Sequence, residues 1–228
     1  MSLIFYDAHR RSVRIGRKIG SGGEGDVFEV EGRPEQVAKI YFPDKVPADP
    51  EKLRYMIGSQ TEALTRLTAW PLDTLHERRG VRQVAGFLMP FVPGGSEIHN
   101  LYLPEFRRQH FPNADWRFLT EAAIHCAAAV EEVHRSGFVI GDLNQNNTMV
   151  LADARIALVD CDSFQVRTPA GKTFRCGVGM TEFTPPELQG IDRASVDREE
   201  NHDRFGLAVL VFYLLIVGRH PYFGVRAD

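Results

Sequence analysis

Three polar side chains in the middle of the chain have the types and spacing that chemistry on a hydroxyl group requires. Asp142 and Asn147 stand in residues 141–147 (GDLNQNN), and Asp160 follows Asn147 by thirteen residues. An aspartate can accept a proton from an attacking hydroxyl, and amide and carboxylate oxygens are the hard ligands that Mg²⁺ prefers. Each residue alone is more often part of a polar turn. Together they predict one base, Asp142, and two metal ligands, Asn147 and Asp160.

A second candidate site is the glycine-rich stretch 20–27 (GSGGEGDV), which fits the pattern G-x-G-x-x-G-x-V. Glycine lets the backbone approach a polyphosphate closely and leaves the backbone N–H groups free to bind it. A glycine-rich hairpin turn without any ligand explains the motif alone equally well. The stretch lies between expected strands and does not open a helix, which disfavours a dinucleotide-binding fold.

Lys39 is a lysine among apolar neighbours in residues 37–40 (VAKI). One interpretation is a strand-edge lysine that buries its stem and keeps its ammonium group in water. The other is a positive charge placed on the α and β phosphates of a nucleotide. The pattern of the residues around it does not decide between the two.

The elements that would position these residues divide the chain into two parts. Residues 1–93 are mainly sheet, with five antiparallel strands expected: three over 13–15, 27–30 and 37–42, and a pair within 81–92. One helix or two short ones are expected after the helix-start signal Asp49-Pro50. Residues 94–228 are mainly helical, with a helix over 115–134, short strands at 148–151 and 156–159, and a buried helix over 205–217. The turn-forming residues 93–95 (PGG) mark the boundary. The expected fold class is α+β.

Composition excludes several classes of partner and location. The chain has 228 residues, 43% hydrophobic content, a formal net charge of −3 and a pI near 6.2. These values favour a globular core and give no reason to expect nucleic acid or an anionic membrane as a partner. The three cysteines lack metal-ligand or disulfide spacing, the N-terminus has no signal-peptide pattern, and the longest apolar run is shorter than the roughly 20 residues of a membrane span. We expect a cytoplasmic protein.

These motifs occur in the order found in the eukaryotic-type protein kinase superfamily, which the chain resembles from Ile19 almost to its end. Residues 87–95 resemble the fifth strand and hinge, with Met89 as gatekeeper, and the backbone groups of Pro90 and Val92 are expected to bond adenine over a floor formed by Met149. The resemblance implies a two-lobed fold with ATP and Mg²⁺ in the cleft. It assigns nucleotide binding to a set of residues in both lobes: Ile19, Gly20, Gly22, Gly25, Val27, Val37, Lys39, Glu51, Met89, Pro90, Val92 and Met149.

In the second lobe the resemblance makes Asp142 the catalytic base and makes Asn147 and Asp160 the Mg²⁺ ligands, with Lys39 as the fourth catalytic residue. Residues 179–187 resemble the substrate-side segment that ends in Ala-Pro-Glu, and 202–208 resemble the buried F-helix. The whole string looks closest to a bacterial branch that is often fused to a C-terminal helix-hairpin-helix segment. By this resemblance the last helices of the second lobe are absent from the chain.

Three departures from the family pattern affect the expected mechanism. The usual His-Arg-Asp is Ile140-Gly141-Asp142, so no catalytic-loop arginine can receive a phosphate on the activation segment. The usual lysine two residues after the base is Asn144, which carries no charge to neutralise the transition state. The usual Asp-Phe-Gly is residues 160–162 (DCD). We therefore expect activity that does not need phosphorylation of the segment 163–184, and slow turnover.

The glutamate that pairs with Lys39 has two candidates. Glu51 fits the pattern Glu-Lys-Leu-x-x-Met of the bacterial branch, and Glu62 fits the distance to Trp70-Pro71 in ordinary kinases. An acid in the first turn of a helix also has a purely structural role, because it interacts favourably with the helix dipole. Glu51 is the preferred candidate.

The function expected from the resemblance is transfer of the γ-phosphoryl group of ATP to a serine or threonine hydroxyl of a protein substrate. Two alternatives stand beside it. Asn144 favours a pseudokinase that binds nucleotide and serves as a scaffold. A small-molecule phosphotransferase is disfavoured because residues 179–187 resemble a platform for peptide substrates.

Overall fold

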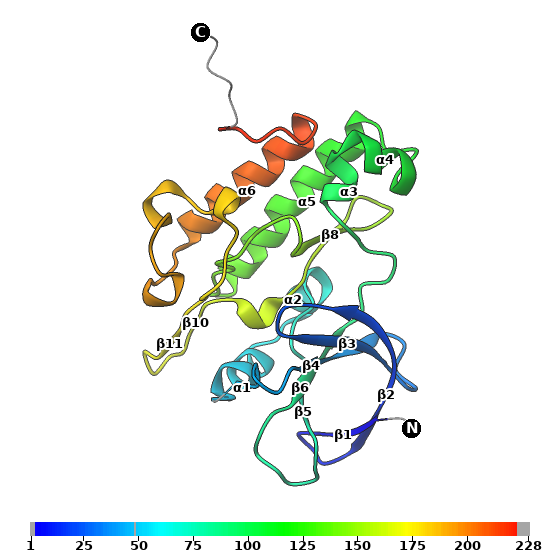
Figure 1. The fold of residues 1–228 in the computed structure, drawn as a ribbon, viewed down its shortest axis with the longest axis vertical. Helices are drawn as coiled ribbons and strands as arrows, with labels where there is room; N and C mark the ends of the chain where they lie inside the picture. The colour runs from blue at the N-terminus through cyan, green and yellow to red at the C-terminus, as the bar shows by residue number, and fades with distance from the viewer. Residues whose placement is uncertain (1–2, 48, 223–228) are drawn as a thin grey trace. The chain divides into compact units, whose positions relative to one another are not determined.

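The computed structural model describes residues 3–47 and 49–222, and it is an α+β structure with two compact units, Met1–Phe91 and Val92–Asp228 (Figure 1). The first unit consists of strands and two short helices. The second consists mainly of helices with short strands and 3₁₀ turns.

The first unit is built around a closed barrel of six strands in the order β1-β2-β3-β4-β6-β5. The expected number of five strands is wrong, and the expected pair within 81–92 reduces to one strand. The strands are β1 (Leu3–Asp7), β2 (Ser12–Ser21), β3 (Gly25–Val30), β4 (Gln36–Tyr41), β5 (Asp73–His76) and β6 (Gly86–Pro90).

Pairing between distant segments explains the two strands that the sequence did not reveal. β1 pairs with β2 and also with β5, where Tyr6 lies opposite His76, so β1 closes the barrel. β5 reads as a polar turn, yet Thr74 and His76 are buried in it. Their side chains lie 3.0 Å apart in a hydrogen bond, and the other ring nitrogen of His76 is 2.8 Å from the Gln83 carbonyl. Burial of these polar groups is tolerated because each has a partner.

The alternation of side chains along the strands separates an apolar core from an outer face. The core residues are Phe5, Val13, Ile15, Val30, Ala38, Leu75, Ala85 and Leu88. Because successive side chains of a strand point to opposite sides, Val37 and Lys39 lie on the face opposite to Ala38. The predicted nucleotide-binding residues of β4 are therefore on the outer face of the barrel.

Two short helices follow β4, as one of the two expected arrangements: α1 (Glu51–Gly58) and α2 (Glu62–Leu67). A new helix begins at α2 because Thr61 acts as its N-cap and accepts a hydrogen bond from the Leu64 N–H at 3.1 Å. The fully buried Trp70 donates its indole N–H to the Met56 carbonyl at 2.9 Å, which fixes the end of α1 to the segment after α2.

The second unit contains two long helices that lie side by side (Figure 1). Its helices and strands are β7 (Ser96–Glu97), α3 (His99–Tyr102), α4 (Pro104–His110), α5 (Trp116–Arg135), β8 (Thr148–Val150), β9 (Ile156–Leu158), β10 (Val166–Arg167), β11 (Thr173–Phe174) and α6 (Glu200–Leu215). Asp115 caps α5 as expected and accepts a hydrogen bond from the Phe118 N–H at 2.9 Å. No helix within the described residues combines the length and apolarity that a membrane span requires.

We expect Gly86→Ala to destabilise the first unit. A Cβ at Gly86 would lie 2.2 Å from the Lys39 carbonyl oxygen of the neighbouring strand, so the β4–β6 pair would have to separate. Overpacking of this kind costs about 1–3 kcal/mol, measured as the free energy of unfolding in urea. Gly58→Ala is the matched control, because a Cβ there meets nothing within 4 Å. Equal stability of the two variants would contradict the packing argument.

Candidate active site

Strand register brings several predicted nucleotide-binding residues of the first unit together. Val27 lies opposite Lys39 in the β3–β4 pair, and Val37 lies opposite Met89 in the β4–β6 pair. Since residues two apart on β4 share a face, these four side chains occupy one surface of three adjacent strands. Gly20 is directly paired with Val27 on the next strand. The register therefore brings these predicted nucleotide-binding residues onto one surface.

Lys39 is a buried lysine with a specific electrostatic environment. Its side chain is only 6% exposed, and its ammonium group lies 3.6 Å from a carboxylate oxygen of Glu24 in the glycine-rich loop. The same ammonium group lies 5.7 Å from the ring centre of Tyr41 and 5.9 Å from that of Phe87, both in cation–π range. A buried cation among such groups is poised to attract an anion.

The glycines of the loop do not all serve the same purpose. A Cβ at Gly25 would lie 2.2 Å from the Ile40 carbonyl, so the packing of β3 on β4 alone requires glycine there. A Cβ at Gly22 would meet its nearest neighbour only at 3.8 Å, and one at Gly23 would meet nothing within 4 Å. The fold does not need glycine at Gly22 or Gly23, which favours a reason outside the fold, such as a ligand at the backbone.

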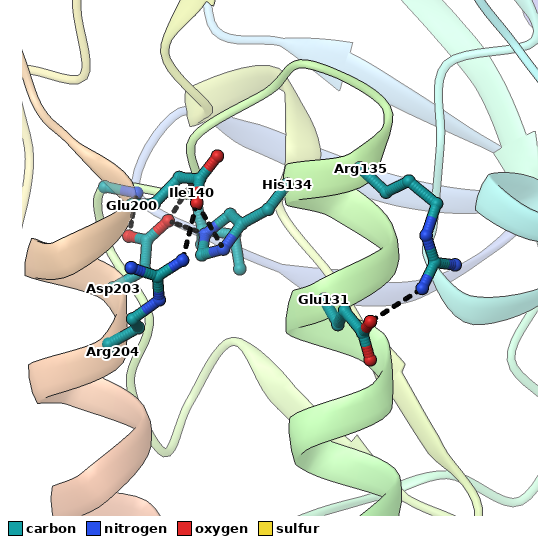
Figure 2. Close-up of polar contacts among 8 residues, drawn as sticks. Glu131, His134, Arg135, Ile140, Glu200, Asp203 and Arg204 are labelled. Atoms are coloured by element: carbon teal, nitrogen blue, oxygen red, sulfur yellow. Dashed lines mark hydrogen bonds and ion pairs between the residues drawn. The ribbon is translucent and has the colours of Figure 1, made fainter.

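In the second unit, Asp203 of α6 anchors the loop that carries Asp142. Its carboxylate accepts the Ile140 N–H and the Gly141 N–H, each at 2.7 Å, and lies 2.8 Å from the His134 ring of α5. Figure 2 shows the carboxylate between the histidine and the loop. Asp203 is 2% exposed, so these partners offset the cost of burying its charge.

Asn144 organises the loop from inside. Its amide nitrogen donates to the Asp142 carboxylate at 2.6 Å, and its amide oxygen accepts the backbone N–H groups of Asn146 at 2.8 Å and Asn147 at 3.2 Å. Its backbone carbonyl accepts the hydroxyl of Thr148 at 2.8 Å. Asn144 is 2% exposed. The residue that replaces the usual lysine is thus a buried structural group of the loop.

The Asp142 carboxylate lies among donors and one negative neighbour. Burial raises the pKa of Asp142, and the negative charge of Asp160 raises it further. Hydrogen bonds from Asn144, the Met180 N–H and Asn147 lower it. The net effect is a pKa above the ordinary value of a carboxyl group. Asn147 donates its amide nitrogen to Asp142 at 3.2 Å, so its amide oxygen is the atom suited to a cation. A raised pKa suits a group that must take up a proton.

Asp160 lies at a backbone position with φ of 60° and ψ of 38°, just after β9 and before a 3₁₀ turn. Val159 donates its N–H to the Asn147 carbonyl at 2.9 Å, which links the two predicted metal ligands through adjacent strands. The Ser163 N–H and hydroxyl both bond to the Asp160 carbonyl, at 3.1 and 2.8 Å. The donor set of one amide and one carboxylate oxygen fits Mg²⁺ better than a softer metal.

The remaining predicted residues fall at different places. A Cβ built on Gly95 would lie 2.9 Å from Val92 and 3.4 Å from Met149, so these two predicted adenine contacts flank the same glycine of the second unit. Pro90 ends β6, and Ile19 is an exposed residue of β2. Glu51 opens α1, where its N–H bonds to the Asp49 carboxylate at 2.9 Å. The choice between Glu51 and Glu62 stays a prediction.

Sequence reasoning missed Glu24 as a partner of Lys39, and it missed Asp203 and His134 as anchors of the loop. Asp203 carried little signal of its own, because it stands in a polar first turn of α6 beside Asn201 and His202. Glu24 carried no such signal either, since its approach to Lys39 depends on where the β3–β4 pairing places the glycine-rich loop.

We expect Asn144→Lys, which restores the usual kinase lysine, to lower both stability and any activity. The site is almost fully buried and supplies two acceptor bonds that an ammonium group cannot supply. Unsatisfied buried groups cost about 1–3 kcal/mol each. Urea denaturation and a rate measurement would check this, with Asn146→Lys at an exposed neighbouring position as control. A faster Asn144→Lys enzyme would show that the loop tolerates the lysine.

The raised pKa of Asp142 predicts a sign for its effect on stability. Its contribution is present below the ordinary value of 3.8 and is lost as pH rises through the folded-state pKa. Asp142→Ala should therefore gain stability relative to the unmodified chain as pH rises from about 4 to 6.

Asp197→Ala is the control with the opposite sign, because a hydrogen bond from Arg175 lowers the pKa of Asp197. That variant should lose stability relative to the unmodified chain as pH rises toward the ordinary value of 3.8, and it should change little relative to that chain from about pH 4 to 6. Urea denaturation at each pH supplies the measurement, and parallel curves for the two variants would refute the assignment.

Comparison with known proteins identifies the type of fold. The chain is 44% identical over 212 residues to Protein kinase YegI of Escherichia coli K12, and 42% identical over 226 residues to the protein of that name in Escherichia coli O157:H7. These matches cover 92% and 99% of the chain but only 32% and 35% of the relatives, so the chain spans about a third of their length. No protein-family model matches the chain.

Solved structures give the same result at low identity. The ROP18 kinase domain in complex with AMP-PNP and sucrose superposes with a TM-score of 0.67 at 16% identity, over 96% of this chain and 68% of that chain. The Toxoplasma gondii specific rhoptry antigen kinase domain gives 0.63 at 13% identity, over 94% and 69%. The chain therefore has a protein kinase fold and resembles the protein kinase superfamily in sequence.

Proposed function

We propose that the chain is an ATP-dependent protein kinase that transfers the γ-phosphoryl group to a serine or threonine hydroxyl of a protein. The observation that supports this best is the Asp142 carboxylate, which is held by Asn144, Asn147 and the Met180 N–H on a loop anchored by Asp203. A buried carboxylate with a raised pKa and a neighbouring amide oxygen is suited to positioning a hydroxyl beside a metal-bound phosphate.

The proposed step is a single displacement. The substrate hydroxyl gives its proton to Asp142 while its oxygen forms a bond to the γ-phosphorus, and the bond from that phosphorus to the bridging oxygen breaks to release ADP. Lys39 and the glycine-rich loop would hold the phosphates. Asn147 and Asp160 would hold Mg²⁺, which supplies charge neutralisation when bound.

A protein substrate is favoured by the segment that follows Val178. Its backbone is ordered by 3₁₀ turns at Thr181–Phe183 and Pro186–Leu188 and by the Thr184 hydroxyl, which donates to the Met180 carbonyl at 2.7 Å. The choice of serine or threonine rests on the resemblance to the bacterial branch, as does a C-terminal helix-hairpin-helix segment. A cytoplasmic location rests on the three cysteines, whose spacing suits neither a disulfide frame nor a zinc site.

A pseudokinase scaffold is the second candidate, and one observation favours it. Asn144 is buried and its amide oxygen and nitrogen both bond within the loop, so it cannot neutralise charge in the transition state as a lysine would. Such a protein would bind Mg²⁺ and ATP without transferring phosphate at a useful rate.

The test combines transfer and binding. Purified chain with radiolabelled ATP and Mg²⁺ should label casein or itself, and Asp142→Ala should reduce this rate about 10²–10⁴-fold, the usual contribution of a general base. Mg²⁺ and ATP should raise the unfolding temperature of both proteins, because a ligand that binds only the folded state stabilises it. Lys39→Ala should weaken the shift, whereas Lys45→Ala at an exposed site should not.

The outcomes separate the two candidates. A thermal shift with no transfer above the Asp142→Ala level would favour the scaffold. Absence of any shift with Mg²⁺ and ATP would reject both.

A further inference from the structure

Gly141 stands where the family pattern has an arginine, and the structure leaves no room there for a side chain. Its φ is 75°, in the region that favours glycine. A Cβ at this position would lie 2.5 Å from the Cβ of Cys176 and 2.8 Å from its sulfur, and 3.6 Å from the Cγ of Arg198. The space beside the loop is thus occupied by the side chains of Cys176 and Arg198, both buried.

Arg198 is a buried arginine held rigidly at its backbone. The side-chain amide of Gln165 forms two hydrogen bonds with the Arg198 backbone. The amide oxygen accepts the Arg198 N–H at 2.6 Å, and the amide nitrogen donates to the Arg198 carbonyl at 2.7 Å. The backbone of Gln165 pairs with Val139, which stands two residues before Gly141. Arg198 is therefore tied to the segment that leads from Val139 into the loop carrying Asp142.

The guanidinium group of Arg198 reaches the segment after Cys176. It donates to the Val178 carbonyl at 3.4 Å, and the Cys176 thiol lies 3.6 Å from the same oxygen. Two residues later, the Met180 N–H donates to the Asp142 carboxylate. A short run of contacts thus leads from Arg198 through Val178 and Met180 to the proposed base.

Stability alone does not explain this arginine. Arg198 is 4% exposed, and its Nε has no hydrogen-bond partner among the described residues. Nearby, Arg167 and Arg175 form ion pairs with Asp197, and within the part of the chain that the structure describes Arg198 joins no such pair. A buried cation with an unsatisfied donor is costly to the fold, so its placement calls for another reason.

We propose that Arg198 is a positioning residue that replaces the missing catalytic-loop arginine, holding the Val178–Met180 backbone against Asp142 without any phosphate. The inference rests on the proposed function, because the segment and the base matter only to a phosphotransferase. The cation comes from the loop before α6 and acts on a backbone carbonyl, so the segment is ordered as soon as the unit folds.

The contact is tested first without reference to activity. Hydrogen–deuterium exchange is measured at the amides of residues 178–180 in the full chain, for Arg198→Met, Arg198→Lys and Arg167→Met. Arg198→Met keeps most of the stem but removes the donors, so exchange should be about tenfold faster or more. Arg198→Lys should be intermediate. Arg167→Met, which removes an exposed cation paired with Asp197, should leave the exchange unchanged.

Kinetics then test the positioning role. Arg198→Met should lower kcat about tenfold and leave KM for ATP unchanged, and Arg198→Lys should recover part of kcat. Phosphatase treatment of the unmodified chain should leave its rate unchanged.

Exchange in Arg198→Met equal to that in Arg167→Met would overturn the proposal, as would loss of activity after phosphatase treatment. If Arg198→Met does not fold, the Arg198→Lys variant supplies the test. Exchange and kcat equal to those of the unmodified chain in that variant would overturn the proposal. If the unmodified chain transfers no phosphate, the proposed function fails, and the exchange data still decide whether Arg198 orders the segment.

Discussion

The second unit depends on one buried carboxylate. Asp203 sits near the start of α6, and its two oxygens bind the backbone of Ile140 and Gly141 and the ring of His134. Because these bonds go to backbone N–H groups, they fix the path of the loop whatever its side chains are. The position of Asp142, one residue further, follows from that path. One buried acid in the polar first turn of α6 thus supplies the fixed point from which the candidate chemistry is built.

Two uncharged residues stand in the loop where the family pattern has charged ones. Asn144 replaces a lysine and binds three groups of its own loop, and Gly141 replaces an arginine and makes space for Cys176 and Arg198. The loop therefore gains internal order and loses positive charge next to Asp142 and Asp160. A buried carboxylate beside another carboxylate has a raised pKa, which suits Asp142 to the proposed role of base, but the loop offers little to neutralise the developing charge of the proposed reaction.

In the first unit, the residues that stabilise the fold and the candidate binding residues lie on opposite faces of the same strands. Ala38 points into the barrel core, while its neighbour Lys39 points outward. Within the glycine-rich loop the same separation holds, because Gly25 is required by the packing of β3 on β4 and Gly22 is not. A substitution at Gly25 is therefore expected to act through stability, whereas one at Gly22 would act through whatever approaches the loop.

The sequence by itself determined the features that depend on local order and spacing. The order of motifs indicated the kinase fold, which the comparisons confirm, and the cap at Asp115 and the 3.6-residue period predicted α5. Such signals lie within a few residues of one another, so no distant contact is needed to read them.

Tertiary structure alone decided the features that depend on contacts between distant segments. β1 and β5 pair with each other across the closed barrel, and β5 has no strong strand pattern of its own. Glu24 meets Lys39 through strand register, Asp203 reaches Gly141 across 62 positions, and Arg198 reaches Val178 across 20. The physical reason is that a hydrogen bond or ion pair depends on distance in space, which spacing along the chain does not encode beyond a single helix or hairpin.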